Sequence, residues 1–121
     1  MSIKVEPAAL ATTVAQFDSA HLLSTRDSRV KVVTVDASVA DGKLRVSWSK
    51  GTAANVDANP TVTVLFAPTE HHGYSLIVDG TAEDVGDGFV ITPTSAILHR
   101  PASHADGPLP PGDCGNDCCR L

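Results

Sequence analysis

The segment SWSKGT, residues 47–52, brings together the groups that proteins use to hold a small anion. Lys50 supplies a positive charge, and Gly51 carries no side chain, so that a ligand can approach the backbone closely. Ser49 or Thr52 can cap a helix and donate a hydrogen bond from its hydroxyl group. The segment follows a strand-like run and precedes a short helix-like run that Pro60 stops. These residues therefore indicate an anion-binding turn.

A helix that begins at this turn would strengthen its attraction for an anion. The first turn of a helix has backbone N–H groups without acceptors, and the helix dipole adds about half a positive charge. Arg29 and Lys31 lie on a neighbouring predicted strand, from which they could reach the same rim. No G-x-x-x-x-G-K-[ST] sequence occurs, so the turn is not a P-loop. Taken locally, it is also typical of a helix cap beside an exposed lysine.

Runs of alternating and β-branched residues predict the strands that must position this turn. The predicted strands cover residues 20–25, 29–39, 43–49, 61–67, 74–85 and 89–100, and short helices are expected over residues 7–18 and 51–59. Asp41-Gly42 is typical of a hairpin, Gly80 of a bulge or bend and Pro93 of an edge or break. In the strand over 43–49, alternation puts Trp48 with Leu44, which predicts a core or interface aromatic. Six antiparallel strands in a chain of this length favour a small barrel.

Length and charge narrow the function classes. The chain has 121 residues, enough for one core, which we place in residues 1–100. A formal net charge of -5 argues against a nucleic-acid binder, and no run is long and apolar enough for a membrane helix. The first residues, MSIKVEPAAL, lack the apolar region of a signal peptide, so we expect a cytoplasmic protein.

The composition changes at Pro101, and residues 101–121 are expected to form an extended tail rich in Pro, Gly and Asp. Its cysteines are Cys114, Cys118 and Cys119, an odd number that indicates no disulfide framework. Their thiolates could hold a metal or undergo redox chemistry, but the spacing is not C-x-x-C. We therefore predict no metal site.

The order of these pieces resembles that of the pyridoxamine 5'-phosphate oxidase-like family, the flavin-binding split barrels. The likeness covers roughly residues 20–100 and rests on a basic residue opening the second strand, the turn at 47–52, the helix that ends at Asn59-Pro60, a strand ending in Phe66, and a V-x-G-x-A strand at 78–82. The resemblance implies a mainly β, six-stranded antiparallel split β-barrel with short helices. It also implies a homodimer that binds FMN at the dimer interface and acts on a small-molecule substrate as a flavin-dependent oxidoreductase.

Carried over by position, the resemblance implies two sets of cofactor-binding residues. The phosphate set comprises Arg29, Lys50, Gly51, Thr52 and Asn55, to which the hydroxyl of Ser49 is added from the local reading. The ring set comprises Val32, Val33, Thr34, Ser47 and Trp48. Because Gly51-Thr52 replaces the usual Arg-Lys pair and the chain ends in DCGNDCCRL, we do not expect a true pyridoxamine phosphate oxidase.

Two other classes stay open. The barrel could bind or carry a deazaflavin, a haem or another anionic small molecule without turnover. It could also be a structural relative that binds no cofactor. No paired carboxylates or other acid–base arrangement stands out in the sequence, so no catalytic side chain is assigned.

Overall fold

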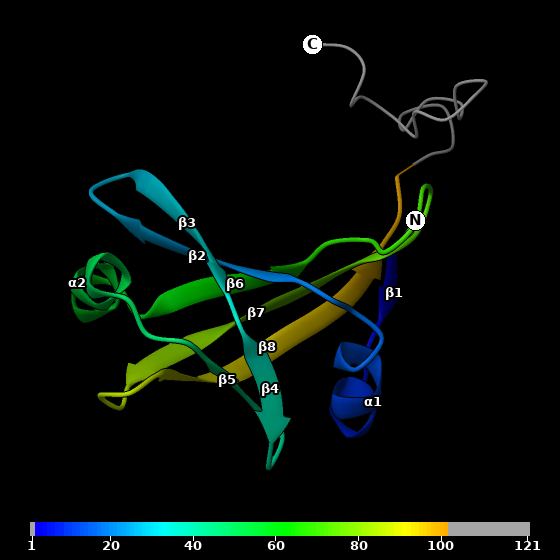
Figure 1. Ribbon diagram of the computed structural model, residues 1–121, viewed down its shortest axis with the longest axis horizontal. Coiled ribbons are helices and arrows are strands. Elements are labelled where there is room, and N and C mark those ends of the chain that lie inside the picture. The colour runs from blue at the N-terminus through cyan, green and yellow to red at the C-terminus, as the bar shows by residue number, and fades with distance from the viewer. Residues whose placement is uncertain (1, 102–121) are drawn as a thin grey trace, which may run out of the picture.

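The computed structural model describes residues 2–101 of the chain, so the predicted tail, with its three cysteines, lies almost wholly outside the described residues. Figure 1 shows a strongly curled antiparallel sheet with a short helix near each of two sides. The elements in chain order are β1 (Ser2–Lys4), η1 (Pro7–Ala9), α1 (Leu10–Val14), β2 (Ala20–Arg26), β3 (Arg29–Val35), β4 (Ala37–Ala40), β5 (Lys43–Val46), α2 (Lys50–Ala58), β6 (Thr61–Phe66), β7 (Ser75–Asp84) and β8 (Phe89–His99).

The sheet curls because its two outermost strands are halves of one continuous stretch. The strand order is β3-β2-β6-β7-β8-β5-β4, and only Asp36 separates β3 from β4 in the chain. The first half pairs with β2 and the second with β5, so the chain crosses the molecule diagonally (Figure 1). The predicted strand over residues 29–39 is therefore this bent pair, and the predicted split-barrel fold is confirmed.

The structure differs from the prediction at one additional strand, at the end of another strand and at the first helix. β1 was not predicted; it pairs with the C-terminal end of β8, from Ser2 opposite His99 to Lys4 opposite Ile97. The strand predicted over residues 43–49 ends at Val46. The predicted helix over residues 7–18 is shorter, with η1 followed by a five-residue α1 that buries only Leu10 and Val14.

The bulge predicted at Gly80 is confirmed by the register of β7 with β8. Asp79 pairs with Ser95 and Gly80 pairs with Pro93, so Thr94 is the extra residue. The Thr94 hydroxyl donates to the carbonyl oxygen of Asp79 at 3.1 Å. A Cβ at Gly80 would overlap the carbonyl oxygen of Thr92, which explains why this position is a glycine.

The core fills the inside of the curl and is mainly aliphatic, since only 4% of the residues in the chain are aromatic. Alternate residues of β2, β5, β6, β7 and β8 point inward. The largest fully buried apolar side chains are Phe89, Leu22, Leu44, Leu76, Ile91, Val64 and Val78. β3 is different, because most of its side chains stay exposed and it pairs only with β2 among the described residues.

Candidate cofactor site

The chain leaves the sheet just before the predicted anion-binding turn. The backbone N–H of Ser47 donates to the carbonyl oxygen of Asp36 at 3.2 Å, and the Asp36 N–H donates to the Ser47 hydroxyl at 3.1 Å. These two bonds tie the end of β5 to the bend between β3 and β4. The three residues that follow Val46 then lead directly into α2.

Trp48 lies outside the core, so the prediction of a core aromatic is wrong. Its exposed fraction is 42%, and its indole N–H donates to both carboxylate oxygens of Asp84, at 3.1 and 3.2 Å. The alternation failed at Trp48 because β5 ends two residues earlier. Whether Trp48 lines an interface or a flavin ring stays a prediction.

The first turn of α2 gathers unsatisfied polar groups. The first helical bond runs from the Ala53 N–H to the Ser49 carbonyl oxygen at 3.0 Å, which leaves the N–H groups of Lys50, Gly51 and Thr52 without acceptors inside the helix. The side-chain oxygens of Ser49 and Thr52 are buried, and neither has a hydrogen-bond partner within residues 2–101. Buried hydroxyls without partners are uncommon and costly, which fits a turn built to meet a polar ligand.

Lys31 of β3 reaches this same turn. A Cβ at Gly51 would stand 2.7 Å from Lys31 Cε and 3.0 Å from Lys31 Nζ. The lysine amine therefore occupies the space that the absence of a side chain at Gly51 leaves open. Lys31 was expected only near the rim, yet it is the cation that the structure places against the α2 backbone.

A groove of about 610 Å³ runs between β3 and α2 and is rich in positive charge. Its lining residues are Arg26, Asp27, Arg29, Val30, Lys31 and Asn55. Asp27 is the only acid among them; it lies 3.6 Å from Arg26 Nε, and its side chain is 85% exposed, so solvent weakens the pair. In a chain with a net charge of -5, three cations in one groove create a local field that attracts anions.

The turn between β2 and β3 explains how Arg26 joins this groove, a position that the sequence analysis missed. Asp27 and Ser28 both have positive φ, 53° and 64°, as the tightest two-residue hairpin turns require. Arg26 therefore pairs directly with Arg29 in the ladder. The signal in the sequence was RDSR, a two-residue turn between two arginines.

Asn55 lies in the groove, but its side chain also holds α2 in place. Its amide donates to the hydroxyl of the fully buried Ser24 at 3.1 Å. One turn later, Asn59 donates to Thr25 at 2.8 Å. Two amides, one in α2 and one directly after it, thus bind two successive hydroxyls of β2, which fixes the position of the helix on the sheet.

The residues predicted to contact the flavin ring lie along β3. Val32 is 56% exposed, Val33 packs partly against the core, and the Thr34 hydroxyl lies 3.4 Å from His21 Nδ1. Within the described part of the chain, the second edge of β3 has no partner strand, so main-chain groups along it are available. Contacts between these groups and a flavin ring stay a prediction.

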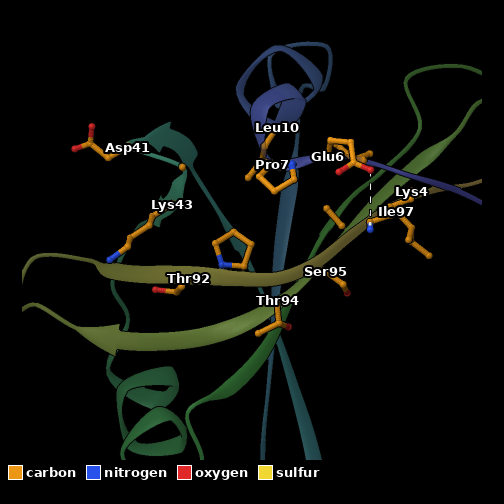
Figure 2. Close-up of a pocket in the computed structure, with 14 residues that line it drawn as sticks. Lys4, Glu6, Pro7, Leu10, Asp41, Lys43, Thr92, Thr94, Ser95 and Ile97 are labelled. Atoms are coloured by element: carbon orange, nitrogen blue, oxygen red, sulfur yellow. Dashed lines mark ion pairs between the residues drawn. The ribbon is translucent and has the colours of Figure 1, made fainter.

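A second cavity, of about 720 Å³, lies beneath α1 and is largely apolar. Figure 2 shows it between the N-terminal segment, the tip of the β4–β5 hairpin and the middle of β8. Its charged residues alternate in sign, with Lys4 at 4.0 Å from Glu6 and Asp41 close to Lys43 in the chain. None of the predicted cofactor residues lines it, and its balanced charges do not favour an anion.

Comparison with known sequences gives two relatives and no matching family model. The uncharacterized protein Mb0449c of Mycobacterium bovis is 32% identical to this chain over 133 residues, covering 95% of this chain and 93% of the relative. The uncharacterized protein MT0457 of Mycobacterium tuberculosis matches with the same identity and coverage.

Comparison with solved structures gives the same fold at low identity. An FAD-binding protein from Mycobacterium smegmatis matches with a TM-score of 0.64 and 17% identity, covering 83% of this chain and 99% of that one. An FAD-binding protein from Mesorhizobium loti gives 0.63 and 16%, covering 81% and 96%. A candidate pyridoxamine 5'-phosphate oxidase from Corynebacterium glutamicum gives 0.60 and 12%, covering 84% and 95%. The fold implied by the sequence resemblance is thereby confirmed.

Proposed function

We propose that this chain is a flavoprotein. The chain belongs to one family with the two mycobacterial proteins, and it has the fold of the pyridoxamine 5'-phosphate oxidase-like split barrels. The flavin would be held through its phosphate, for which FMN is the simplest case. The observation that carries the proposal is the position of Lys31 over Gly51, at the first turn of α2, within a groove of three cations.

The residues present fit a phosphate group. The unpaired N–H groups of the first turn of α2 are donors, and the buried hydroxyls of Ser49 and Thr52 are unpartnered within residues 2–101. Lys31 and Lys50 supply charge without any ion pair among the described residues. Charge-assisted hydrogen bonds of this kind are about twice as strong as neutral ones. The cradle therefore does not depend on the Arg-Lys pair that Gly51-Thr52 replaces.

The reaction class would be oxidation and reduction of a small molecule. When bound, the flavin supplies the hydride or electron transfer, and the protein supplies binding, orientation and electrostatics. Hydride or electron transfer by the flavin does not itself need an acid or base side chain. The roles assigned to this chain are therefore to bind the phosphate and to line the ring along β3.

The homodimer is proposed from the exposed side of β3. Val30 and Val32 are 61% and 56% exposed, although valine is among the residues most often buried. They lie on a strand whose second edge is unpaired within the described residues. A second copy of the chain that covers β3 would bury these valines and close the flavin between two subunits.

The test is an equilibrium titration with FMN and with riboflavin, followed by flavin fluorescence. We expect FMN to bind at least tenfold more tightly than riboflavin, because riboflavin lacks the phosphate. Lys31→Ala and Lys50→Ala should each weaken FMN binding by more than tenfold, about 1.4 kcal/mol. Lys43→Ala is the charge-matched control, because Lys43 is exposed beside the apolar cavity, and it should leave the affinity unchanged.

Several results would contradict the proposal. Equal affinity for FMN and riboflavin would show that the protein has no phosphate site. If Lys43→Ala weakened FMN binding as much as Lys31→Ala does, the effect would come from the net charge of the protein and not from a specific site. Addition of NADH or NADPH to the FMN-loaded protein tests the reaction class: loss of flavin absorbance supports an oxidoreductase. An unchanged spectrum with both donors favours the non-catalytic binding role, and preferential uptake of a deazaflavin or haem would identify that ligand instead.

A further inference from the structure

The second edge of β8 is paired at both ends but not in its middle. β5 pairs with residues 89–91, and β1 pairs with residues 97–99. One further bond, from the Val5 N–H to the Ala96 carbonyl oxygen at 2.8 Å, extends the β1 side. Within residues 2–101, no strand pairs with residues 92–95 on this side. An open length of edge presents backbone groups to which an extended segment can add itself.

The apolar cavity beneath α1 lies along this open length of β8. Thr92, Thr94 and Ser95 line it from the strand, and Figure 2 shows Pro7 and Leu10 on its other side. Its volume of about 720 Å³ is within the range of roughly 300–1,000 Å³ that is usual for ligand sites. Because the charged side chains at its rim alternate in sign, an uncharged, apolar segment suits it better than an ion does.

The sequence that follows the described residues contains a segment of this kind. Residues 107–112 read GPLPPG and carry no charged side chain, and Leu109 is the first large aliphatic residue after Pro101. Each proline fixes one backbone angle, so a proline-rich segment loses less conformational entropy on binding than a flexible one. Leu109 keeps its backbone N–H, so it can still donate a hydrogen bond to the open edge of β8.

The chain leaves the sheet close enough to the cavity for this segment to reach it. Pro101 is seven residues beyond Thr94, which is at most about 23 Å at the rise of a strand. Leu109 is eight residues beyond Pro101, and a stretch of that length can span about 26 Å when extended. The intervening residues are therefore enough for the chain to turn back along β8 and place Leu109 at the cavity.

We propose that residues 107–112 bind in the apolar cavity of their own chain, with Leu109 between Pro7, Leu10 and the open edge of β8. The segment would shield the apolar lining from solvent and supply partners for backbone groups of residues 92–95. This inference is independent of the proposed function, because none of the predicted cofactor residues lines the cavity.

The test places p-benzoylphenylalanine, a photo-crosslinking amino acid, at position 109 of the full-length protein. We expect irradiation to join position 109 to residues 4–10 or 92–97, in a product with the mass of one chain. Thr92→Arg, which fills the mouth of the cavity, should lower the yield of this product by about tenfold. Thr81→Arg should leave the yield unchanged; it is the matched control, because Thr81 pairs with Thr92 in the ladder and does not line the cavity.

A second measurement needs no crosslinking group. Leu109→Asp puts a charge into the apolar segment, so it should shift the amide NMR signals of Leu10 and of residues 92–97 in the full-length protein. Leu121→Asp adds the same charge at the other leucine after Pro101 and should leave those signals in place.

Three results would overturn the inference: a crosslink to another part of the chain, no crosslink, or amide signals that do not respond to Leu109→Asp. A product with the mass of two chains would overturn the assignment to the same chain, since the cavity would then hold the segment of a second copy. None of these results bears on flavin binding, which the FMN titration measures separately.

Discussion

The amine end of Lys31 lies where a side chain at Gly51 would be: a Cβ added to Gly51 would stand 3.0 Å from Lys31 Nζ. This relationship joins β3 to the first turn of α2. Lys31 can take this position only because residue 51 has no side chain, whether or not a ligand also needs the glycine.

Gly51→Ala should separate ligand binding from stability. The new methyl group would displace the flexible end of Lys31, so we expect FMN affinity to fall by up to about tenfold, or about 1.4 kcal/mol. The free energy of unfolding should stay unchanged or rise by up to about 1 kcal/mol, because alanine favours a helix over glycine. Titration and urea denaturation of the same variant measure both quantities.

A double-mutant cycle identifies the cause of that loss. If Gly51→Ala acts through Lys31, the variant that carries both Gly51→Ala and Lys31→Ala should bind FMN no more weakly than Lys31→Ala alone. Additive losses would show that the methyl group blocks the ligand directly and that Lys31 is not the group it displaces.

Asn55→Ala should destabilise the protein through β2. Its amide is the partner of the Ser24 hydroxyl, which is fully buried, and the variant would leave that hydroxyl without it. We expect a loss of about 1–3 kcal/mol in the free energy of unfolding. Adding Ser24→Ala should recover part of it, since no buried hydroxyl is then left unpaired. Loss of FMN binding with unchanged stability would instead make Asn55 chiefly a ligand residue.

Gly80→Ala should destabilise the sheet. The added methyl group meets the backbone carbonyl of Thr92, which cannot move without breaking the bulge between β7 and β8. Overpacking of this kind costs about 1–3 kcal/mol, measurable as a lower midpoint of thermal or urea unfolding. Thr81→Ala, at the next and exposed position of β7, is the control and should cost far less.

Val32→Lys should shift the oligomeric state toward monomer. Val32 is exposed on β3 and does not line the cationic groove, but it belongs to the predicted ring set, so the oligomeric state is measured on the flavin-free protein. Burying a charged amine in place of an apolar side chain should raise the dimer dissociation constant by at least tenfold, about 1.4 kcal/mol. Sedimentation velocity measures it, with Val85→Lys, at the β7–β8 turn, as the control. A monomeric wild-type protein would refute the homodimer.

Local patterns in the sequence were enough for most of the strands and for the position of the α2 turn, because both depend on neighbouring residues. The alternation through β6 and β7 and the Asp41-Gly42 hairpin are examples. The end of β5 at Val46 was not predictable in this way, since it depends on bonds between Ser47 and Asp36, eleven residues apart.

The candidate site was only partly predictable for the same reason. Lys50 and Gly51 are adjacent in the chain and stood out together, whereas the contact between Lys31 and Gly51 joins residues twenty positions apart. Arg26 enters the groove through the positive φ angles of Asp27 and Ser28, and two successive positive φ angles are uncommon outside glycine. The bond from Asn55 to Ser24 needs α2 packed on β2, which no local pattern specifies.

The most direct test of the central claim is a crystal structure of the protein grown with FMN. The account predicts that the phosphate lies within hydrogen-bond distance of Lys31 Nζ and of a backbone N–H in the first turn of α2. A flavin seated in the apolar cavity beneath α1, or a phosphate that contacts neither Lys31 nor α2, would contradict it.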